Sequence, residues 1–406
     1  MKTPAVILFA CATAIYCAET FRPEKVGPAA IAGMDAARLA RIPAKMKEFV
    51  DQGTAAGFVL LVARRGHVAS LDAVGFQDRE AKTLMRTDSI FRIKSMTKPM
   101  TAAGVMILVD EARIGLLDPV ERYLPEYKGI RLNPCGITRQ GNCDLVNPSR
   151  LITVRDLLTH TSGLPDGPAG APVSTLAEKV QTGAGRVSLV AEPGTVWRYS
   201  NLGFATLGRL IEVVSGRPYD VFMAERLFKP LGMTDTHYFL PAEKESRLAA
   251  LYTLDAAGKL NRAPAQPGDA DAKIPGPEGG LFSTASDQAR FYQMLLDMGL
   301  FNGQRILSVA AVQAMTSNQT GELKGVEFSP GLGMGFGFGV VKEPLGTYRY
   351  QSVGSFMKGG AYRTLAWGDP ARSLLGIIMY QRTNGGGDTA PETNAFVTLA
   401  EAAVDR

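Results

Sequence analysis

Ser95 and Lys98 are the two residues in this chain whose types and spacing most clearly suggest chemistry. They stand three positions apart at the start of an apolar stretch, and side chains with this spacing share one face of a helix. The Lys98 amine could therefore reach the Ser95 hydroxyl and accept its proton, which would make Ser95 a nucleophile. A free lysine has a pKa near ~10.4, so the apolar surroundings of Lys98 must lower that pKa before the amine can act as a base.

A second Ser-x-x-Lys sequence, Ser355 to Lys358, shows that the spacing alone is weak evidence. About one or two such matches are expected by chance in a chain of this size. The first match continues into an apolar helix through Leu108, and Pro99 is compatible with the first turn of a helix. Ser355 instead lies among glycines and aromatic residues, which are typical of a strand edge. Only the first pair is expected to share a helical face.

Two further segments carry residues that suit such chemistry. Tyr199 and Asn201 follow a Glu-Pro-Gly turn and open a predicted helix, which places a phenol and an amide at a helix start. Lys358-Gly359-Gly360 follows a predicted strand, where the missing side chains would let a substrate lie against the strand edge. Taken singly, Tyr199 could be a core residue and Lys358 a surface charge.

In this order, Ser95-Met-Thr-Lys98, Tyr199-Ser-Asn201 and Lys358-Gly-Gly360 resemble the motifs of the penicillin-recognising serine hydrolases. That group comprises class C β-lactamases, D-Ala-D-Ala peptidases and the family VIII carboxylesterases. Within the group, this chain most resembles the family VIII carboxylesterases. The likeness covers roughly the whole mature chain. It implies an α/β (α+β) fold of the β-lactamase/transpeptidase type, in which terminal helices flank an antiparallel sheet and a mostly helical domain is inserted.

The resemblance also implies a role for each motif residue in an acyl-enzyme mechanism. Ser95 would attack a carbonyl carbon, Lys98 and Tyr199 would handle its proton, and Tyr199 would pass a proton to the leaving group. The N–H groups of Ser95 and Ala361 would form the oxyanion hole. Asn201 would hold the amine network or an amide of the acyl group. The strand edge that binds the substrate would consist of Lys358, Gly359, Gly360 and Ala361.

The third motif bears on the class of substrate. In the β-lactamases that this chain resembles, the third motif reads Lys-Thr-Gly. Here Gly359 takes the place of the threonine, so the hydroxyl that helps to hold a β-lactam carboxylate is missing. Lys358 therefore favours an anionic substrate and Gly359 opposes one, while Arg363 is either a second anion contact or a surface arginine. We predict a carboxylesterase of short-acyl esters with some β-lactam hydrolysis. The alternatives are a β-lactamase or D-Ala-D-Ala carboxypeptidase, an acyltransferase, and a non-catalytic peptidoglycan-binding module.

Other chemistries find less support in the sequence. A Ser-His-Asp hydrolase would need a base among His67, His160 and His237, but the chain has no G-x-S-x-G elbow, and His160 is expected to be a packing residue. There is no H-E-x-x-H motif and no Cys/His cluster, so neither a metal nor another cofactor is expected. The net charge of +5 is spread without long basic runs, which argues against a nucleic-acid partner. The expected partner is a small ester or β-lactam molecule.

The predicted elements place strands from both ends of the chain around a helical middle. A β-hairpin is expected over 58–74, and further strands over 331–339, 348–353, 361–367 and 374–380. Helices are expected over 34–50, 153–158, 202–214, 283–296 and 394–404. The prediction is an α/β domain of residues 19–94 and 300–406, a mostly helical domain of residues 95–299, and an active site between the two.

The N-terminus and the cysteines indicate an exported protein. Residues 1–18 have a positive start and an apolar core too short to span a bilayer, a pattern typical of a secretory signal peptide. The mature protein is expected to be periplasmic or secreted, with a lipid anchor as the less favoured option. Cys135 and Cys143 would remain after cleavage. An oxidising compartment would let them pair around a polar loop, although two unpaired thiols are the alternative.

Overall fold

The computed structural model of the chain describes residues 20–136, 143–166, 173–264, 272–323, 329–384 and 390–405. The predicted signal peptide, residues 1–18, lies outside the described residues and stays a prediction. In the part of the chain that is described, no helix is both long and apolar enough to cross a membrane.

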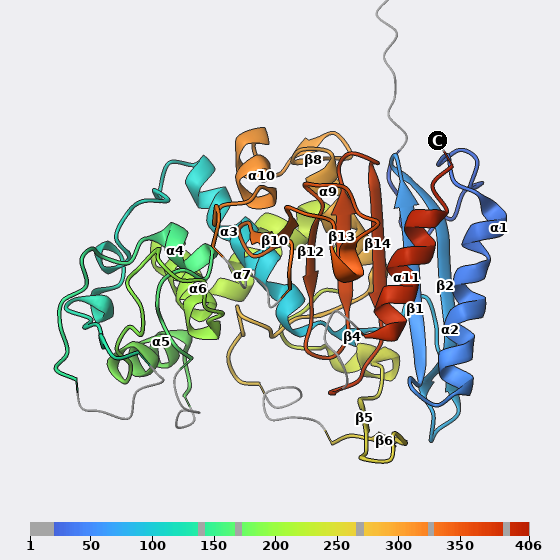
Figure 1. Cartoon of the computed structure of the whole chain (residues 1–406), viewed down its shortest axis with the longest axis horizontal. Coiled ribbons are helices and arrows are strands. Elements are labelled where there is room, and N and C mark those ends of the chain that lie inside the picture. Colours follow the sequence, from blue (N-terminus) through green and yellow to red (C-terminus); the bar gives the residue numbers. More distant parts are fainter. Residues whose placement is uncertain are drawn as a thin grey trace, which may run out of the picture.

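An antiparallel sheet of eight strands joins the two ends of the chain (Figure 1). β1 pairs with β2 on one side and with β14 on the other, so the predicted hairpin continues the sheet that the C-terminal strands form. The strand order is β10-β11-β12-β13-β14-β1-β2-β3. The strands are β1 (Gly57–Arg64), β2 (His67–Asp78), β3 (Thr83–Leu84), β10 (Leu332–Met334), β11 (Gly339–Val341), β12 (Phe356–Gly359), β13 (Leu365–Asp369) and β14 (Leu374–Met379).

Helices cover both faces of this sheet, which explains why every residue of β1 is buried. Successive side chains of a strand point to opposite faces. Leu60 packs with α1 (Ala36–Leu39), α2 (Arg41–Asp51) and α11 (Pro391–Ala402), whereas its neighbour Leu61 packs in the cluster that contains α9 (Ala285–Leu296). The predicted fold, an antiparallel sheet flanked by terminal helices, is confirmed.

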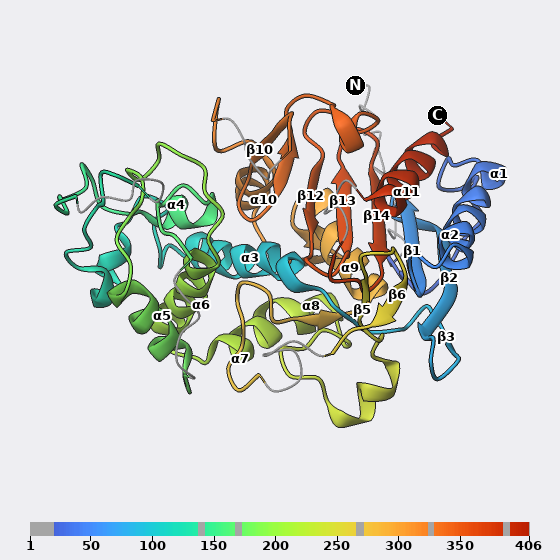
Figure 2. The same cartoon turned by 60° about the horizontal axis from the view of Figure 1, so that its bottom comes forward.

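The helical middle of the chain lies beside the β10 end of the sheet (Figures 1 and 2). α3 (Thr97–Asp110) is buried from Thr97 to Leu108 because neighbouring elements cover it on all sides. The other helices there are α4 (Val154–Leu158), α5 (Leu176–Gly185), α6 (Asn201–Ser215), α7 (Tyr219–Met223), the π-helix η4 (Ala224–Phe228) and α8 (Lys229–Leu231). The predicted division into two domains stays a prediction, and α9, which it assigned to the helical part, packs against β13 and β14.

Short elements complete the described chain. The 3-10 helices are η1 (Lys94–Met96), η2 (Val120–Arg122), η3 (Pro125–Tyr127), η5 (Ala242–Arg247) and η7 (Gly346–Tyr348), and α10 spans Val309–Thr316. Three two-stranded ladders pair β4 (Phe91–Arg92) with β7 (Phe282–Ser283), β5 (Tyr252–Leu254) with β6 (Leu260–Arg262), and β8 (Leu300–Phe301) with β9 (Gln304–Arg305).

The single strand predicted over 331–339 is wrong, because this segment forms β10, a turn and β11. The Gly335 N–H donates to the carbonyl of Phe338 at 2.8 Å, which closes the turn. Gly337 has a φ of 80°, a conformation that glycine adopts without strain. The alternating glycines therefore belong to a tight hairpin. They do not form one long strand with a face that lacks side chains.

Two other strand predictions also need correction. Residues 348–353 form the end of η7 and turns, in which the Gln351 N–H donates to the carbonyl of Tyr348 at 3.0 Å. The strand predicted over 361–367 begins only at Leu365, since the preceding residues turn back from β12. Arg363 in that turn has a φ of 75°, and its N–H donates to the carbonyl of Gly360 at 2.9 Å.

Cys135 and Cys143 form a disulfide, with their Cα atoms 6.1 Å apart. We expect both thiols to resist iodoacetamide in denatured but unreduced protein and to react fully after reduction. Peptide mapping by mass spectrometry would measure this at each cysteine, with a Cys135→Ser/Cys143→Ser variant as the unlabelled control. Immediate labelling of both residues without a reductant would show that the bond is absent in the isolated protein.

Candidate active site

Ser95 lies in η1, between a small ladder and the buried helix α3. β4 pairs with β7, and the Ile93 N–H donates to the carbonyl of Leu281 at 3.0 Å, which anchors the chain just before the serine. Lys94 has a positive φ of 46°, which marks a sharp turn of the backbone there. Ser95 is half-buried, and α3 then begins at Thr97. The nucleophile candidate therefore sits on a tight turn whose two ends are fixed by packing.

Lys98 is fully buried and surrounded by hydrogen-bond acceptors. Its Nζ lies 3.4 Å from Ser95 Oγ, 2.8 Å from Asn201 Oδ1 and 2.6 Å from the carbonyl oxygen of Glu278. An amine that donates its two N–H groups to the oxygens of Asn201 and Glu278 directs its lone pair toward Ser95 Oγ. The predicted i, i+3 geometry is therefore present, although Ser95 precedes the α-helix and only Lys98 lies within it.

Tyr199 approaches the same serine from the start of α6. Its hydroxyl donates to Ser95 Oγ at 2.7 Å. The Lys98 Nζ lies 4.6 Å from the centre of the Tyr199 ring and the Lys358 Nζ lies 5.0 Å from it. Both lysine side chains therefore pack against the ring of Tyr199. An amine and a phenol that both contact one hydroxyl can remove its proton and later return a proton to a leaving group.

His160 packs behind Tyr199. The two rings stack with centroids 4.6 Å apart, and the Ser200 N–H donates to His160 Nδ1 at 3.2 Å. Burial, together with repulsion from Lys358 and Lys98, lowers the pKa of His160 well below its usual range, so the imidazole is neutral. His160, which the sequence predicts to be a packing residue, contacts the phenol ring that faces Ser95.

The end of β12 reaches the turn that carries Ser95. Lys358 is buried, Gly359 pairs with Leu365 of β13, and Ala361 is exposed in the turn that follows. A Cβ at Gly360 would lie 2.2 Å from the carbonyl oxygen of Ile93, a separation that real Cβ atoms do not show. The strand end and the serine turn therefore meet backbone to backbone, which places the third motif beside the first two.

The second Ser-x-x-Lys match does not form a pair of its own. Ser355 precedes β12, it is fully buried, and its hydroxyl finds no hydrogen-bond partner among the described residues. Lys358 belongs instead to the group around Tyr199. The two Ser-x-x-Lys sequences differ because the first lies at the start of a helix and the second at a strand. Only a helix brings positions i and i+3 onto one face.

Two residues near the site were missed by sequence reasoning. Glu278 supplies the carbonyl oxygen that accepts from Lys98, and its carboxylate pairs with Lys179 of α5. Asp166 accepts hydrogen bonds from the backbone and side chain of Asn201. No local pattern marks either residue, because the sequence separations are large and the Glu278 contact uses a backbone atom.

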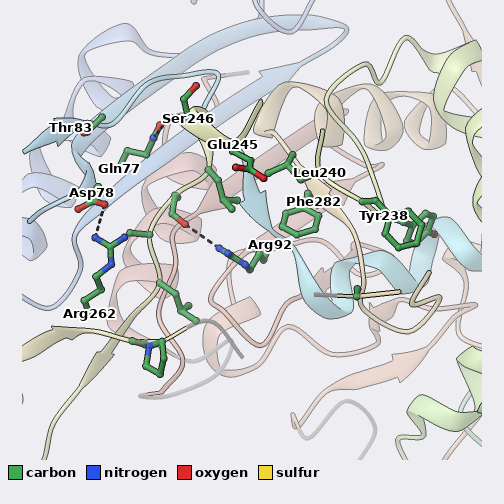
Figure 3. Close-up of a pocket in the computed structure, with 18 residues that line it drawn as sticks. Gln77, Asp78, Thr83, Arg92, Tyr238, Leu240, Glu245, Ser246, Arg262 and Phe282 are labelled. Carbon is green, nitrogen blue, oxygen red and sulfur yellow. Dashed lines mark hydrogen bonds and ion pairs between the residues drawn. The ribbon is translucent and has the colours of Figure 1, made fainter. Parts of the chain in front are cut away.

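A cavity of about 1000 Å³ lies between β2, β6, η5 and the β4–β7 ladder (Figure 3). Arg92 extends into it over the ring of Phe282, at 5.7 Å from the ring centre, and Arg262 pairs with Asp78 at its rim. Ser95, Lys98 and Tyr199 are absent from the described lining.

Comparison with known proteins agrees with this geometry. A model of the Beta-lactamase family matches residues 42–400. Protein Rv1367c of Mycobacterium tuberculosis is 33% identical over 359 residues, which cover 83% of this chain and 88% of that protein. Esterase EstB of Burkholderia gladioli is 29% identical over 407 residues, covering 89% and 95%.

The solved structures that resemble this chain share its fold. The structure of EstCE1, a hydrolase with promiscuous acyltransferase activity, matches with a TM-score of 0.76 at 24% sequence identity, and the match covers 91% of this chain and 99% of that one. Sequence family, fold and the grouping of a serine with an amine and a phenol all agree. The chain belongs to the Beta-lactamase family and is a serine hydrolase of the β-lactamase and penicillin-binding protein superfamily.

Proposed function

We propose that this protein is a carboxylesterase that hydrolyses short-acyl esters through an acyl-enzyme on Ser95. The observation that carries the proposal is the contact of Ser95 Oγ with both Lys98 Nζ and the Tyr199 hydroxyl. EstB, a relative along nearly the whole chain, is named an esterase. Gly359 supports an ester substrate, since it offers no hydroxyl to hold the carboxylate of a β-lactam.

In the proposed mechanism, the Ser95 oxygen attacks the ester carbonyl while its proton passes to the Lys98–Tyr199 pair. The N–H groups of Ser95 and Ala361 stabilise the oxyanion, a contribution worth ~100-fold to ~1000-fold per donor in rate. Tyr199 then protonates the departing alcohol, and water releases the acid from Ser95. Asn201 holds the Lys98 amine, while Lys358, Gly359 and Gly360 bind the substrate against the end of β12.

The burial of Lys358 beside Tyr199 favours a second candidate, an enzyme for anionic substrates such as β-lactams or D-Ala-D-Ala peptides. An acyltransferase would use the same acyl-enzyme with an alcohol or amine in place of water. Initial rates with p-nitrophenyl butyrate and nitrocefin, measured side by side, separate these functions. Faster ester turnover supports the carboxylesterase, and faster nitrocefin turnover replaces it with a β-lactamase. Turnover of neither contradicts the carboxylesterase and the β-lactamase, and favours a D-Ala-D-Ala peptidase, an acyltransferase or a binding module.

Lys358→Met is expected to distinguish a carboxylate-binding lysine from one that only packs. A charge-assisted hydrogen bond contributes about 1.5 to 3 kcal/mol, so kcat/KM for the anionic p-nitrophenyl hemisuccinate should fall about 10-fold to 100-fold more than for neutral p-nitrophenyl butyrate. Lys45→Met, a change on the surface of α2, is the control. Equal losses on the two esters would reject a carboxylate contact.

We also propose that the mature protein is exported, to the periplasm or the medium. The disulfide between Cys135 and Cys143 supports this, because such bonds persist in oxidising compartments. Fractionation of cells that produce the full chain, followed by intact-mass measurement, would locate the protein and any cleavage site. Recovery of uncleaved protein from the cytoplasm alone would contradict export.

A further inference from the structure

Asp166 makes a set of hydrogen bonds that ends at the lysine of the active site. Its Oδ1 accepts from the backbone N–H groups of Asn201 at 2.5 Å and Leu202 at 3.2 Å. Its Oδ2 accepts from Asn201 Nδ2 at 2.9 Å. On the other side of the same amide, Asn201 Oδ1 accepts from Lys98 Nζ at 2.8 Å. One side-chain amide thus connects an exposed carboxylate with the buried amine.

The carboxylate determines which way the Asn201 amide faces. An ionised carboxylate only accepts hydrogen bonds, so it selects the NH₂ end of an amide. With the NH₂ end at Asp166, the oxygen end must face Lys98. A turned amide would present its NH₂ group to the N–H groups of Lys98, donor against donor. The turned amide would also place its oxygen against the Asp166 carboxylate, acceptor against acceptor. Both contacts of the turned amide are therefore unfavourable.

Asp166 also stabilises the start of α6, and this second effect must be separated from the first. The Asn201 and Leu202 N–H groups are among the first N–H groups of a helix, which have no acceptor inside it. A carboxylate there also interacts favourably with the positive end of the helix dipole. Ser200 caps the same terminus by accepting from the Gly203 N–H at 3.0 Å. A capping role alone would affect stability and leave the lysine unchanged.

We propose that Asp166 is a positioning residue for Lys98. It orients the Asn201 amide so that its oxygen, together with the carbonyl of Glu278, holds the amine beside Ser95 Oγ. The proposal rests on the proposed role of Lys98 in activating Ser95. Asp166 does not touch the reacting atoms, and its effect reaches them through a single side chain.

Asp166→Asn separates orientation from capping. The new side chain keeps an oxygen that can accept from the helix N–H groups, but its NH₂ group favours the turned Asn201 amide. We expect kcat for p-nitrophenyl butyrate to fall about 10-fold to 100-fold, as for other small misplacements of catalytic groups, with KM and Tm nearly unchanged. Asp166→Glu should restore part of kcat. Asp35→Asn, which alters a carboxylate cap of α1, is the matched control.

The decisive measurement combines Asp166→Asn with Asn201→Ala. If Asp166 acts through Asn201, Asp166→Asn should change kcat less than about twofold in the Asn201→Ala background. An undiminished effect there would overturn the proposal, as would a kcat within twofold of wild type for Asp166→Asn alone.

A second readout does not depend on ester turnover. A fluorophosphonate probe forms a bond from phosphorus to Ser95 Oγ and releases fluoride, while the serine proton passes to the neighbouring base. The labelling rate therefore reports activation of Ser95 whatever the substrate class. A rate that falls with Asp166→Asn supports the positioning role even if ester hydrolysis is absent and the proposed function fails. An unchanged rate, or no labelling of Ser95 in the wild type, overturns the positioning role itself.

Discussion

Ser95→Ala is expected to lower kcat for p-nitrophenyl butyrate by at least about 10³-fold. Removal of the nucleophile in a serine hydrolase leaves only binding and oxyanion stabilisation, so the covalent route is lost. Ser95 is half-buried on a short turn, and loss of one oxygen there should leave the fold intact. Steady-state kinetics and circular dichroism on the same preparations would check both expectations.

The chain contains its own matched control for this experiment. Ser355 also stands three residues before a lysine, but it is buried and its hydroxyl has no described partner. Ser355→Ala should therefore leave kcat within about twofold of the wild type. Turnover that survives Ser95→Ala, or that disappears with Ser355→Ala while the fold is retained, would refute the assignment of Ser95 as the nucleophile.

Tyr199→Phe is expected to lower kcat by about 10²-fold to 10⁴-fold, the usual contribution of general acid–base catalysis. The change removes only the hydroxyl that donates to Ser95 Oγ at 2.7 Å. The ring that stacks on His160 and faces Lys98 and Lys358 is kept. KM for p-nitrophenyl butyrate should therefore change little, because the loss concerns the transition state more than substrate binding.

Tyr350→Phe is a suitable control, since Tyr350 is 45% exposed and lies outside the group around Ser95. Pre-steady-state measurement of the p-nitrophenol burst would show whether acylation or deacylation slows. A Tyr199→Phe enzyme that retains more than half of the wild-type kcat would exclude the phenol from proton transfer and leave Lys98 as the sole candidate base.

The parts of the fold that could be predicted are those with a strong local pattern. β1 and β14 are continuous apolar runs, and α6 has both an N-cap at Ser200 and a left-handed glycine at Gly216. The glycine-rich segment from 331 to 339 was misjudged because alternating glycines suit a bare strand and a tight hairpin equally well. In the structure the turn is anchored by tertiary hydrogen bonds, from the Phe336 N–H to the carbonyl of Met315 and from the Gly337 N–H to the carbonyl of Leu158, which no local pattern predicts.

The residues of the candidate site also differ in whether a local sequence pattern predicts them. Ser95 and Lys98 could be paired from sequence because a helix converts their spacing into proximity. Tyr199 and Lys358 could be added only through the resemblance to a family, since no local rule brings them to Ser95. The Glu278 carbonyl and Asp166 could not be predicted, because a backbone oxygen has no residue signature and a single aspartate before a helix has many structural roles.

The contact between Gly360 and Ile93 has a consequence for how this enzyme could acquire new substrates. With no room for even one carbon between the two backbones, the distance between the end of β12 and the turn before Ser95 is fixed. Mutation cannot adjust that distance gradually, because the smallest enlargement of residue 360 would displace the turn that carries Ser95. Selection, natural or in the laboratory, must instead act on the side chains around these two backbones, where a substitution leaves this distance unchanged.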